Sequence, residues 1–309
     1  MNPKPIICLG SAVWDTILQV EAIPSAGVKV LAQRAVQRAS GMAASAAIAI
    51  ARLGAPVAFW SRLGDDETGA RYVRDFAAEG IDVSQLRAFA GMGTPFSSII
   101  VDKDGERAVI PFYDAQFPAD PGWLPLHTVA QAAAVLVDVR WQEGAAALLT
   151  EARRCGVPAI LDADTAAPEV LAHLVPLATH VLFSEPAFRI YTGVDYAKQA
   201  LAELGTRLGC DVVGVTLGPS GAALWQKDGK GVVHIAAPAV QAIDTLNAGD
   251  IWHGTFAWAL CRGYSLQSVV EIANVAAAMK CEVFGGNVGA PTLAALMARA
   301  KTLGFNGFA

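Results

Sequence analysis

A short segment with two carboxylates and several small residues directly precedes an apolar run. Residues 244–250 read Asp-Thr-Leu-Asn-Ala-Gly-Asp, and the apolar run occupies residues 251–260. Ala248 and Gly249 are small, so backbone N–H groups there can approach a ligand closely, and Asn247 is a residue type that tolerates positive φ. If the run is a helix, its first N–H groups lack partners and carry the positive end of the dipole. The segment therefore predicts an anion site at a helix start.

A carboxylate beside an anion site suits the transfer of a phosphoryl group. Catalysis of that reaction depends mainly on positioning and charge neutralisation, and one carboxylate must accept the proton of the acceptor hydroxyl. We expect Asp250 to be this base, and Asn247, Ala248 and Gly249 to bind the anion through their backbone. A turn followed by a helix cap has the same composition, because Asp, Asn and Gly are common in both. Taken alone, the segment leaves both interpretations open.

Length and composition favour one α/β domain. A chain of 309 residues suits a single domain with an added small element. Hydrophobic residues make up 54% and charged residues 17%, without an uninterrupted apolar span of membrane length. The first apolar block, residues 6–10, is too short for a secretory signal. We therefore expect a cytoplasmic protein without a membrane partner.

Charge and cysteine usage exclude several other classes. The net charge is −5 and basic residues are not clustered, so we expect no nucleic-acid partner. The spacing of the histidines is not typical of a metal site, and we expect His253 to be a packed, hydrogen-bonded helix residue. Five cysteines without a C-x-x-C pair argue against disulfides and a zinc site. We expect all of them to be small buried hydrophobic residues: Cys8, Cys155, Cys210, Cys261 and Cys281.

Short apolar runs alternate with alanine-rich stretches, which is typical of a parallel sheet covered by helices on both faces. The predicted strands are residues 5–9, 57–62, 134–139, 159–161, 180–183 and 212–217. The predicted helices are residues 41–53, 66–78, 144–153, 196–208, 249–262, 266–283 and 293–303.

Two regions, residues 13–38 and 94–115, alternate polar and apolar residues instead. Residues 101–107 within the second have the composition of a hairpin turn. These regions predict a small separate sheet. We expect it to cover the site as a lid within a single domain of residues 1–309.

These motifs, in this order, resemble those of the PfkB or ribokinase-like carbohydrate kinases over essentially the whole chain. The family's C-terminal signature, Asp-Thr-x-Gly-Ala-Gly-Asp, is matched by residues 244–250, with Asn247 in place of the first glycine. Residues 40–47 approach its N-terminal signature and are followed by Leu53-Gly54 and residues 64–66. The resemblance implies a ribokinase-like α/β fold: a central, mostly parallel sheet with helices on both faces, plus a small β-sheet lid.

The resemblance also implies an activity: transfer of the γ-phosphoryl group of ATP, with Mg²⁺, to a primary hydroxyl of a ketohexose-type sugar. Asp250 would be the base, and Asn247, Ala248 and Gly249 the anion hole. The implied sugar contacts are Asp15, Lys29, Ser40, Gly41, Ser45 and Arg140. The implied nucleotide contacts are Ser184, Thr216, Gly218, Gly221 and Asn274. Glu185 is the candidate magnesium ligand, and the Asp244 carboxylate and the Leu246 carbonyl are the candidate ligands of a monovalent cation such as K⁺. A homodimer through the lid is the candidate assembly.

Within the family, the chain is most similar to bacterial sulfofructose kinases and more distantly to ketohexokinases. This likeness rests on residues 138–141, 161–164, 183–186, 280–281 and 285–289. Lys29 and Arg140 match positions that hold the sulfonate there, and a cation pair suits this anion. Pro111 stands where an asparagine accompanies them, and it has no side-chain donor. Both 6-deoxy-6-sulfofructose and a neutral ketohexose such as fructose therefore stay open.

Three other functions compete with this one. A ribose or nucleoside kinase would use the same fold, although neither lid segment has a paired-aromatic clamp for a base. A non-catalytic sugar or nucleotide sensor is suggested by departures from the family pattern at Ser45, Ala187 and Asn247, but the retained Asp250 argues against it. A dehydrogenase would need G-x-G-x-x-G after the first strand, and Gly10 is not followed by that spacing.

Taken singly, several of these residues also have ordinary structural interpretations. Lys29 and Arg140 are typical of solvated surface charges, and Asn274 of an exposed helical residue. Asp15 and the Thr216–Gly218 region have the composition of turns. Only their combination with the two signatures favours binding.

Overall fold

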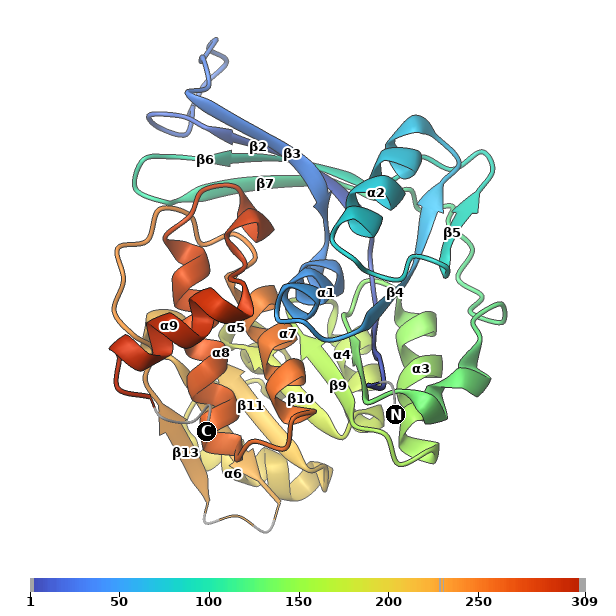
Figure 1. Cartoon of the computed structure of the whole chain (residues 1–309), viewed down its shortest axis with the longest axis vertical. Coiled ribbons are helices and arrows are strands. Elements are labelled where there is room, and N and C mark those ends of the chain that lie inside the picture. Colours follow the sequence, from blue (N-terminus) through green and yellow to red (C-terminus); the bar gives the residue numbers. More distant parts are fainter. Residues whose placement is uncertain (1–2, 228, 230, 306–309) are drawn as a thin grey trace.

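The computed structural model describes residues 3–227, 229 and 231–305, which form two sheets (Figure 1). From edge to edge, the larger sheet contains β13 (Val232–Ile235), β12 (Ala222–Gln226), β11 (Val212–Thr216), β10 (His180–Ser184), β9 (Ala159–Ala163), β8 (Ala134–Val137), β1 (Ile6–Leu9), β4 (Val57–Gly64) and β5 (Leu86–Phe89). The smaller sheet contains β3 (Arg34–Ser40), β2 (Val13–Gln19), β6 (Phe96–Val101) and β7 (Arg107–Phe112).

The larger sheet is parallel except at one edge. Strands β4, β1, β8, β9, β10 and β11 pair in parallel, as does β5 with β4, whereas β12 and β13 pair antiparallel. The central strands β1 and β8 are buried at every position, which explains their continuous apolar runs. The expected mostly parallel sheet is confirmed. Strands β5, β12 and β13 were not predicted.

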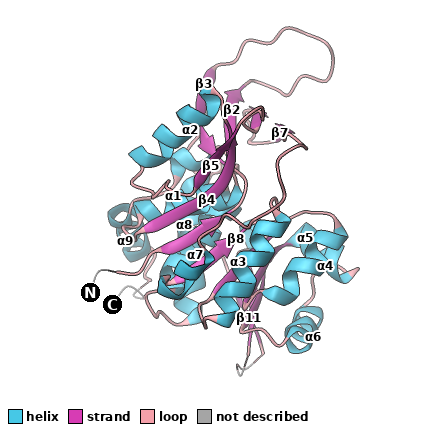
Figure 2. Ribbon diagram, turned by 90° about the vertical axis from the view of Figure 1, so that its right-hand side faces the viewer, coloured by secondary structure: helices cyan, strands magenta, loops and turns pink. Residues whose placement is uncertain are grey.

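Helices cover both faces of the larger sheet, as Figure 2 shows from the side. One layer contains α1 (Met42–Arg52), α2 (Glu67–Ala78), α7 (Ala248–Leu260), α8 (Leu266–Cys281) and α9 (Leu293–Thr302), and the other contains α3 (Gln142–Arg154), α4 (Pro168–Leu174), α5 (Glu185–Thr192) and α6 (Lys198–Leu208). Alternate residues of β1 enter the two cores: Ile6 and Cys8 face one layer, and Ile7 and Leu9 the other. The expected helices on both faces are therefore confirmed, while α4 and α5 were not predicted.

Close packing of α1 against α7 sets the position of residues 244–250, the candidate anion-binding segment. Gly254 of α7 lies against α1, where a Cβ atom would be 2.3 Å from the carbonyl oxygen of Ala46. Ala43, Ala44, Ala46 and Ala47 of α1 are fully buried and leave room for this approach. The small residues at this contact bring the start of α7 close to the start of α1.

The smaller sheet lies beside the start of α7 (Figure 1). Strand β2 pairs antiparallel with β3 and parallel with β6, and β6 pairs antiparallel with β7. Asp102 begins the β6–β7 turn, its Oδ1 accepts hydrogen bonds from the N–H groups of Asp104 and Glu106, and Gly105 takes a φ of 81°. The predicted sheet and its hairpin turn are confirmed.

Two further observations bear on the sequence expectations. The described cysteines are free thiols, and Cys8 and Cys210 are buried, but Cys155 and Cys281 are half-buried and Cys261 is exposed. The expectation of five buried cysteines is therefore wrong, because α7 ends at Leu260 and Cys261 follows it at the surface. Among the described residues, each helix is too short or too polar to cross a membrane.

Candidate active site

The candidate anion-binding segment, residues 244–250, contains a left-handed residue at the start of α7. Asn247 is the N-cap residue, with φ 61° and ψ 11°, and it is the only described non-glycine residue with a positive φ. Asn247 therefore adopts the positive φ that its residue type was expected to tolerate. Gly249 lies inside the first turn without a positive φ, and a Cβ atom there would meet nothing within 4 Å. Its contribution is open space in front of the helix N-terminus, not an unusual conformation.

Asp250 lies in the first turn of α7 and lines the same space. Its Oδ2 atom accepts a hydrogen bond of 2.6 Å from Nδ2 of Asn247. Burial raises the pKa of Asp250 to about 8, and Asn247 opposes this rise. The nearby carboxylates of Asp164, Asp138 and Asp15 raise it further. A carboxyl with a pKa near neutrality is suited to exchange a proton with a bound hydroxyl.

Two cavities meet at this segment. The first, of about 380 Å³, is lined by most of the predicted catalytic and sugar-contact residues: Asp15, Ser40, Gly41, Arg140, Asn247, Ala248, Gly249 and Asp250. The second, of about 520 Å³, contains most of the predicted nucleotide contacts: Thr216, Gly218, Gly221 and Asn274. Both are lined by Ala248 and Gly249. The helix N-terminus therefore faces the junction at which a group could pass between two ligands.

Asp15 projects from the small sheet into the first cavity. Cross-strand partners place Arg38, Asp15, Ser97 and Pro111 in one row across the four strands. Burial raises the pKa of Asp15 to about 6, although hydrogen bonds with Ser40 and Ser97 lower it. Pro111 lies on β7, an edge strand, where a missing N–H group is tolerated. It lines the cavity with an apolar ring.

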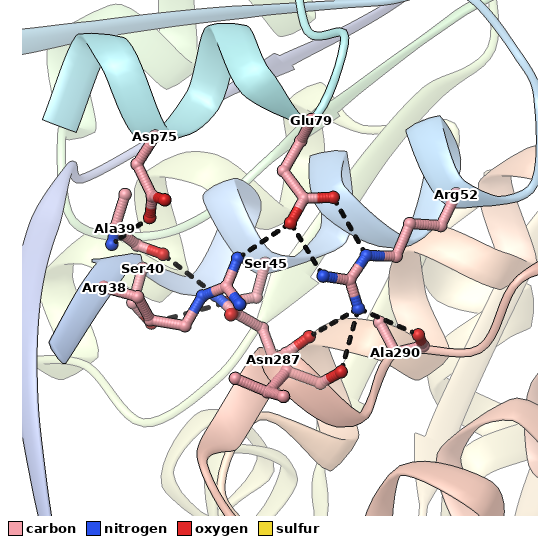
Figure 3. A network of polar contacts seen from close by, with 10 residues as sticks. Arg38, Ala39, Ser40, Ser45, Arg52, Asp75, Glu79, Asn287 and Ala290 are labelled. Atoms are coloured by element: carbon pink, nitrogen blue, oxygen red, sulfur yellow. Dashed lines mark hydrogen bonds and ion pairs between the residues drawn. The ribbon is translucent and has the colours of Figure 1, made fainter. Parts of the chain in front are cut away.

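A polar network fixes the base of the small sheet (Figure 3). Glu79 of α2 accepts hydrogen bonds from Arg38 of β3 at 3.0 Å and from Arg52 of α1 at 2.7 and 2.9 Å. Arg52 also donates to the carbonyl oxygens of Asn287, Val288 and Ala290. Burial alone would raise the pKa of Glu79, but the two arginines hold it below its usual value. The network thus joins β3, α1, α2 and the loop after α8.

Ser45 belongs to this network and not to the cavity wall. Its hydroxyl is buried and lies 3.5 Å from the hydroxyl of Ser40 and 3.1 Å from Nδ2 of Asn287 (Figure 3). The Asn287 amide also donates to the carbonyl oxygen of Ala39. Ser45 therefore packs behind Ser40, and of these two serines it is Ser40 that lines the cavity.

Most of the predicted nucleotide contacts line the second cavity. Thr216 ends β11 and lines both cavities. Gly221 takes a φ of 91°, and a Cβ atom there would be 2.0 Å from the carbonyl oxygen of Ile235. Ser184 caps α5 by accepting a hydrogen bond from the N–H group of Ala187, and it lines the first cavity instead of the second.

Asn274 is buried within α8, so the interpretation as an exposed residue is wrong. Its Oδ1 atom accepts a hydrogen bond of 2.8 Å from the indole N–H of Trp252. Its Nδ2 atom donates to the carbonyl oxygens of Ile235 and Ala236 at 3.0 and 3.2 Å. The amide is satisfied by the protein, and Asn274 shapes the cavity wall by joining α7, α8 and the end of β13.

Besides Ser45, two more predicted contacts are not brought to the cavities. Lys29 is exposed in the loop after β2, beyond the last β2–β3 pair, Gln19 with Arg34. Glu185 is exposed at the first position of α5. Neither lines either cavity. In the part of the chain that the structure describes, no three His, Cys, Asp or Glu residues are grouped as a metal site.

Asp162 and His253 form a buried pair that sequence reasoning missed. Nδ1 of His253 lies 2.7 Å from the carbonyl oxygen of Gly249 and 3.4 Å from Oδ2 of Asp162. Burial lowers the pKa of His253 to about 4, so the ring is neutral near pH 7. Burial, followed by the charge of Asp250, raises the pKa of Asp162 well above its usual value. The packed, hydrogen-bonded role expected of His253 is confirmed.

Two further residues shape the site without having been assigned to it. Asp138, just after β8, accepts hydrogen bonds from the N–H groups of Ser11, Ala43 and Arg140. Arg107 of β7 donates to the hydroxyl of Thr245 and lines both cavities. The sequence held a usable signal for Asp138 and Asp162, because the carboxyl ends of parallel strands commonly carry ligand contacts.

Asp244, one of the two residues assigned to a monovalent cation, contacts a buried lysine. Oδ1 of Asp244 accepts a hydrogen bond of 2.8 Å from the N–H group of Leu246, and Oδ2 accepts from Gly285 and Gly286 at 2.9 Å. Nζ of Lys280 lies 3.4 Å from Oδ2 and donates to the carbonyl oxygen of Asp244. Both side chains are fully buried. Burial lowers the pKa of Lys280, and Asp244 opposes this change.

Comparison with known proteins agrees with this geometry. The pfkB family of carbohydrate kinases matches residues 4–293. Ribokinase from Haemophilus influenzae is 29% identical over 297 residues, which cover 94% of this chain and 96% of that protein. Ribokinase from Arabidopsis thaliana is 28% identical over 306 residues, which cover 92% and 80%.

Solved structures are similar over almost the whole chain. A protein from Agrobacterium tumefaciens named as a candidate ribokinase has a TM-score of 0.94 and 43% identity, with 98% of this chain and 99% of that chain covered. Arabidopsis thaliana ribokinase complexed with ribose and ATP has a TM-score of 0.81 and 25% identity, with 97% and 99% covered.

The chain belongs to the pfkB family of carbohydrate kinases. The expected ribokinase-like fold is confirmed, as is the expected enzyme class, an ATP-dependent carbohydrate kinase. The particular likeness to sulfofructose kinases stays a prediction.

Proposed function

We propose that this chain transfers the γ-phosphoryl group of ATP to a primary hydroxyl of a neutral sugar, either ribose or a ketohexose such as fructose. The observation that carries the proposal is the junction of two cavities at the N-terminus of α7, with Asp250 beside it. The cavity containing Asp15 would hold the sugar, and the cavity containing Thr216 and Gly221 would hold the nucleotide.

In this mechanism Asp250 accepts the proton of the attacking hydroxyl. The sugar oxygen forms a bond to the γ-phosphorus as the bond from that phosphorus to the β–γ bridging oxygen breaks, which leaves ADP. Backbone N–H groups at Ala248 and Gly249 stabilise the charge on the migrating group, and the open space at Gly249 admits it. His253 stays neutral and holds the first turn of α7 through the Gly249 carbonyl.

The residues present fit a magnesium ion only in part. Mg²⁺ bound with a nucleotide uses phosphates, water and one or two carboxylates, so a dedicated protein cage is not needed. Asp164 lines the first cavity and fits this role, whereas Glu185 is exposed outside both cavities. Bound there, the ion would neutralise phosphate charge. We therefore propose Asp164 in place of Glu185 as its protein ligand.

The small sheet would act as the lid of a single domain. Its inner face contributes Asp15, Ser97 and Pro111 to the first cavity, so movement of the sheet would open or close the sugar site. Arg107 extends from the same sheet to Thr245 of the anion-binding segment. Closure would therefore bring a cation to the phosphates and exclude the water that otherwise hydrolyses ATP.

The charges that line the sugar cavity favour a neutral acceptor. Four aspartates, Asp15, Asp162, Asp164 and Asp250, line it and outnumber its two arginines, Arg107 and Arg140. Carboxyl groups form hydrogen bonds with sugar hydroxyls, and each one that is ionised repels an anion. Lys29, the expected partner of Arg140 for a sulfonate, is exposed and lines neither cavity. The Arabidopsis relative complexed with ribose and ATP supports ribose as one candidate.

A coupled assay of ADP release would test this proposal with ribose, fructose, 6-deoxy-6-sulfofructose and adenosine. We expect the highest kcat/KM with ribose or fructose. A preference of about tenfold or more for the sulfonated sugar, equivalent to one charge-assisted contact, would overturn the neutral acceptor. Absence of turnover with every sugar would instead favour the non-catalytic sensor.

We also propose that the outer face of the small sheet forms a homodimer. Ile110 is 64% exposed, and Phe96 and Phe112, each 47% exposed, pack against each other at 5.3 Å between ring centroids. Contiguous exposed apolar residues are typical of interaction surfaces. Light scattering of the wild type and of Ile110→Glu would test this assembly. A monomeric wild type would overturn it.

A further inference from the structure

The buried carboxylate of Asp244 already has a full set of partners. An ionised carboxylate offers about four acceptor positions. Three are taken by the N–H groups of Leu246, Gly285 and Gly286, and the ammonium of Lys280 lies beside Oδ2. Lys280 comes from the last turn of α8, and its side chain has no exposed surface.

The loop after α8 is shaped to complete this arrangement. Gly285 and Gly286 have φ values of 108° and 60°, a conformation that glycine adopts readily and that directs consecutive N–H groups to one anion. Both groups donate to Oδ2 of Asp244. A monovalent cation at Asp244 would have to displace these donors and would also lie next to the Lys280 ammonium. Because the site is fully buried, that like-charge contact would be poorly screened.

The residues of this chain therefore do not fit the monovalent cation that the family resemblance implied. We propose that Lys280 is a permanent counter-ion of Asp244 and replaces that cation, so that the enzyme works without K⁺. This inference rests on the kinase function proposed above. It makes Lys280 a positioning residue, because its ammonium touches Asp244 and not the cavities.

Lys280 can act on the anion-binding segment through two contacts. It donates to the main-chain carbonyl of Asp244, immediately before Thr245, and it neutralises the carboxylate that holds the N–H group of Leu246. Leu246 is followed by Asn247, whose left-handed conformation begins α7. The lysine thus fixes the chain at the entrance to the anion site.

The first test uses the wild type. Initial rates are measured with ATP and the preferred sugar in sodium, potassium and choline salts at constant ionic strength and constant Mg²⁺. We expect the same kcat and KM in all three salts. Activation by potassium of about tenfold or more, the size of one charge-assisted interaction, would overturn the inference.

The second test uses Lys280→Met, which keeps the length of the side chain and removes its charge. We expect kcat to fall by roughly tenfold to a hundredfold in choline salt, and to recover in part when potassium or ammonium replaces choline. The exposed Lys301 of α9 provides the control Lys301→Met, which should retain the wild-type rate in every salt. An unchanged rate for Lys280→Met in choline salt would overturn the inference.

Thermal unfolding without substrates separates this inference from the proposed function. We expect potassium and ammonium, but not choline, to raise the Tm of Lys280→Met, whereas the Tm of the wild type and of Lys301→Met should be equal in all three salts. This result would support the inference even if no sugar were phosphorylated, which would refute only the proposed function. A specific rise in the wild-type Tm with potassium would overturn the inference, and that measurement stands even if Lys280→Met does not fold.

Discussion

The substitution Asp250→Asn tests both the chemistry and the electrostatics of the cavity. The hydrogen-bond partner of the Asp250 carboxylate is the amide of Asn247, at 2.6 Å, and not a cation. Asparagine keeps the shape of the side chain and an oxygen acceptor for that amide, but it cannot take a proton from a hydroxyl. Loss of a general base typically lowers the rate by about 10²–10⁴-fold. We expect kcat to fall by this amount and ATP binding to change little.

The same substitution should stabilise the folded protein. Burial raises the pKa of Asp250 from 3.8 to about 8, so near neutral pH the folded chain holds a proton that the unfolded chain has released. Because the folded state binds more protons, stability from this group falls as pH rises from about 4 to about 8. The penalty near pH 7 is on the order of 2–4 kcal/mol, with the lower end favoured because Asp250 faces an open cavity.

Asp250→Asn removes this penalty. The variant should therefore be more stable than the wild type near about pH 8 and similar to it near about pH 4. Below its pKa of about 8 the wild-type carboxyl is increasingly protonated, so wild-type kcat/KM should rise with pH through that value. Coupled ADP release and urea unfolding across this range measure both effects.

Asp195, in the chain segment after α5, provides a control of the same chemical change, Asp195→Asn, because it is exposed and its ion pair with Arg189 is solvated. We expect it to leave both the rate and the pH dependence of stability unchanged. Turnover of Asp250→Asn within about threefold of the wild type would refute its role as the base. Lower stability of that variant near neutral pH would refute the argument from burial.

Three smaller predictions follow from individual contacts. Asn247→Gly should remain active, because glycine adopts a φ of 61° readily. Since Asn247 lowers the pKa of Asp250, loss of its amide should move the pH profile of kcat/KM to higher pH. An unchanged profile would contradict this prediction. Gly254→Ala normally favours a helix, yet here the Cβ atom would be 2.3 Å from the Ala46 carbonyl oxygen, so urea unfolding should show a loss of about 1–3 kcal/mol and not a gain. Glu79→Gln should lower stability by roughly 1–3 kcal/mol near neutral pH, and because the pKa of Glu79 is held below its usual 4.5, the difference should vanish in acid, below the folded-state pKa.

Contiguous sequence patterns predicted the parts of the molecule that local forces determine. The central strands are continuous apolar runs because both faces are buried, and residues 244–250 contain the turn and helix-start chemistry within seven positions. The missed strands β5, β12 and β13 have four or five residues and lie at or near the sheet edges. Their patterns are short and partly exposed, so periodicity does not distinguish them from loops.

Residues that meet through the tertiary fold could not be paired from the sequence. Asp244 and Lys280 are separated by 36 positions, and Asp162 approaches His253 only because β9 and α7 pack together. Lys29 illustrates the opposite error. Its position in sequence suggested a ligand contact, but the paired part of β2 and β3 ends before it and leaves it in an exposed loop.

The departures from the family pattern are matched by contacts elsewhere, which weighs against a non-catalytic sensor. Asn247 replaces a glycine, yet it adopts the left-handed conformation and adds a hydrogen bond to Asp250. Ser45 is shorter than the usual asparagine, and the amide of Asn287 reaches it from the loop after α8. A chain released from catalysis would have no reason to keep a buried carboxylate of raised pKa beside an open helix N-terminus, because that charge lowers stability. Asp250 is retained although its burial lowers stability, and Asn247 and Asn287 make contacts that compensate for the departures nearby. This is the strongest structural argument that the site transfers phosphoryl groups.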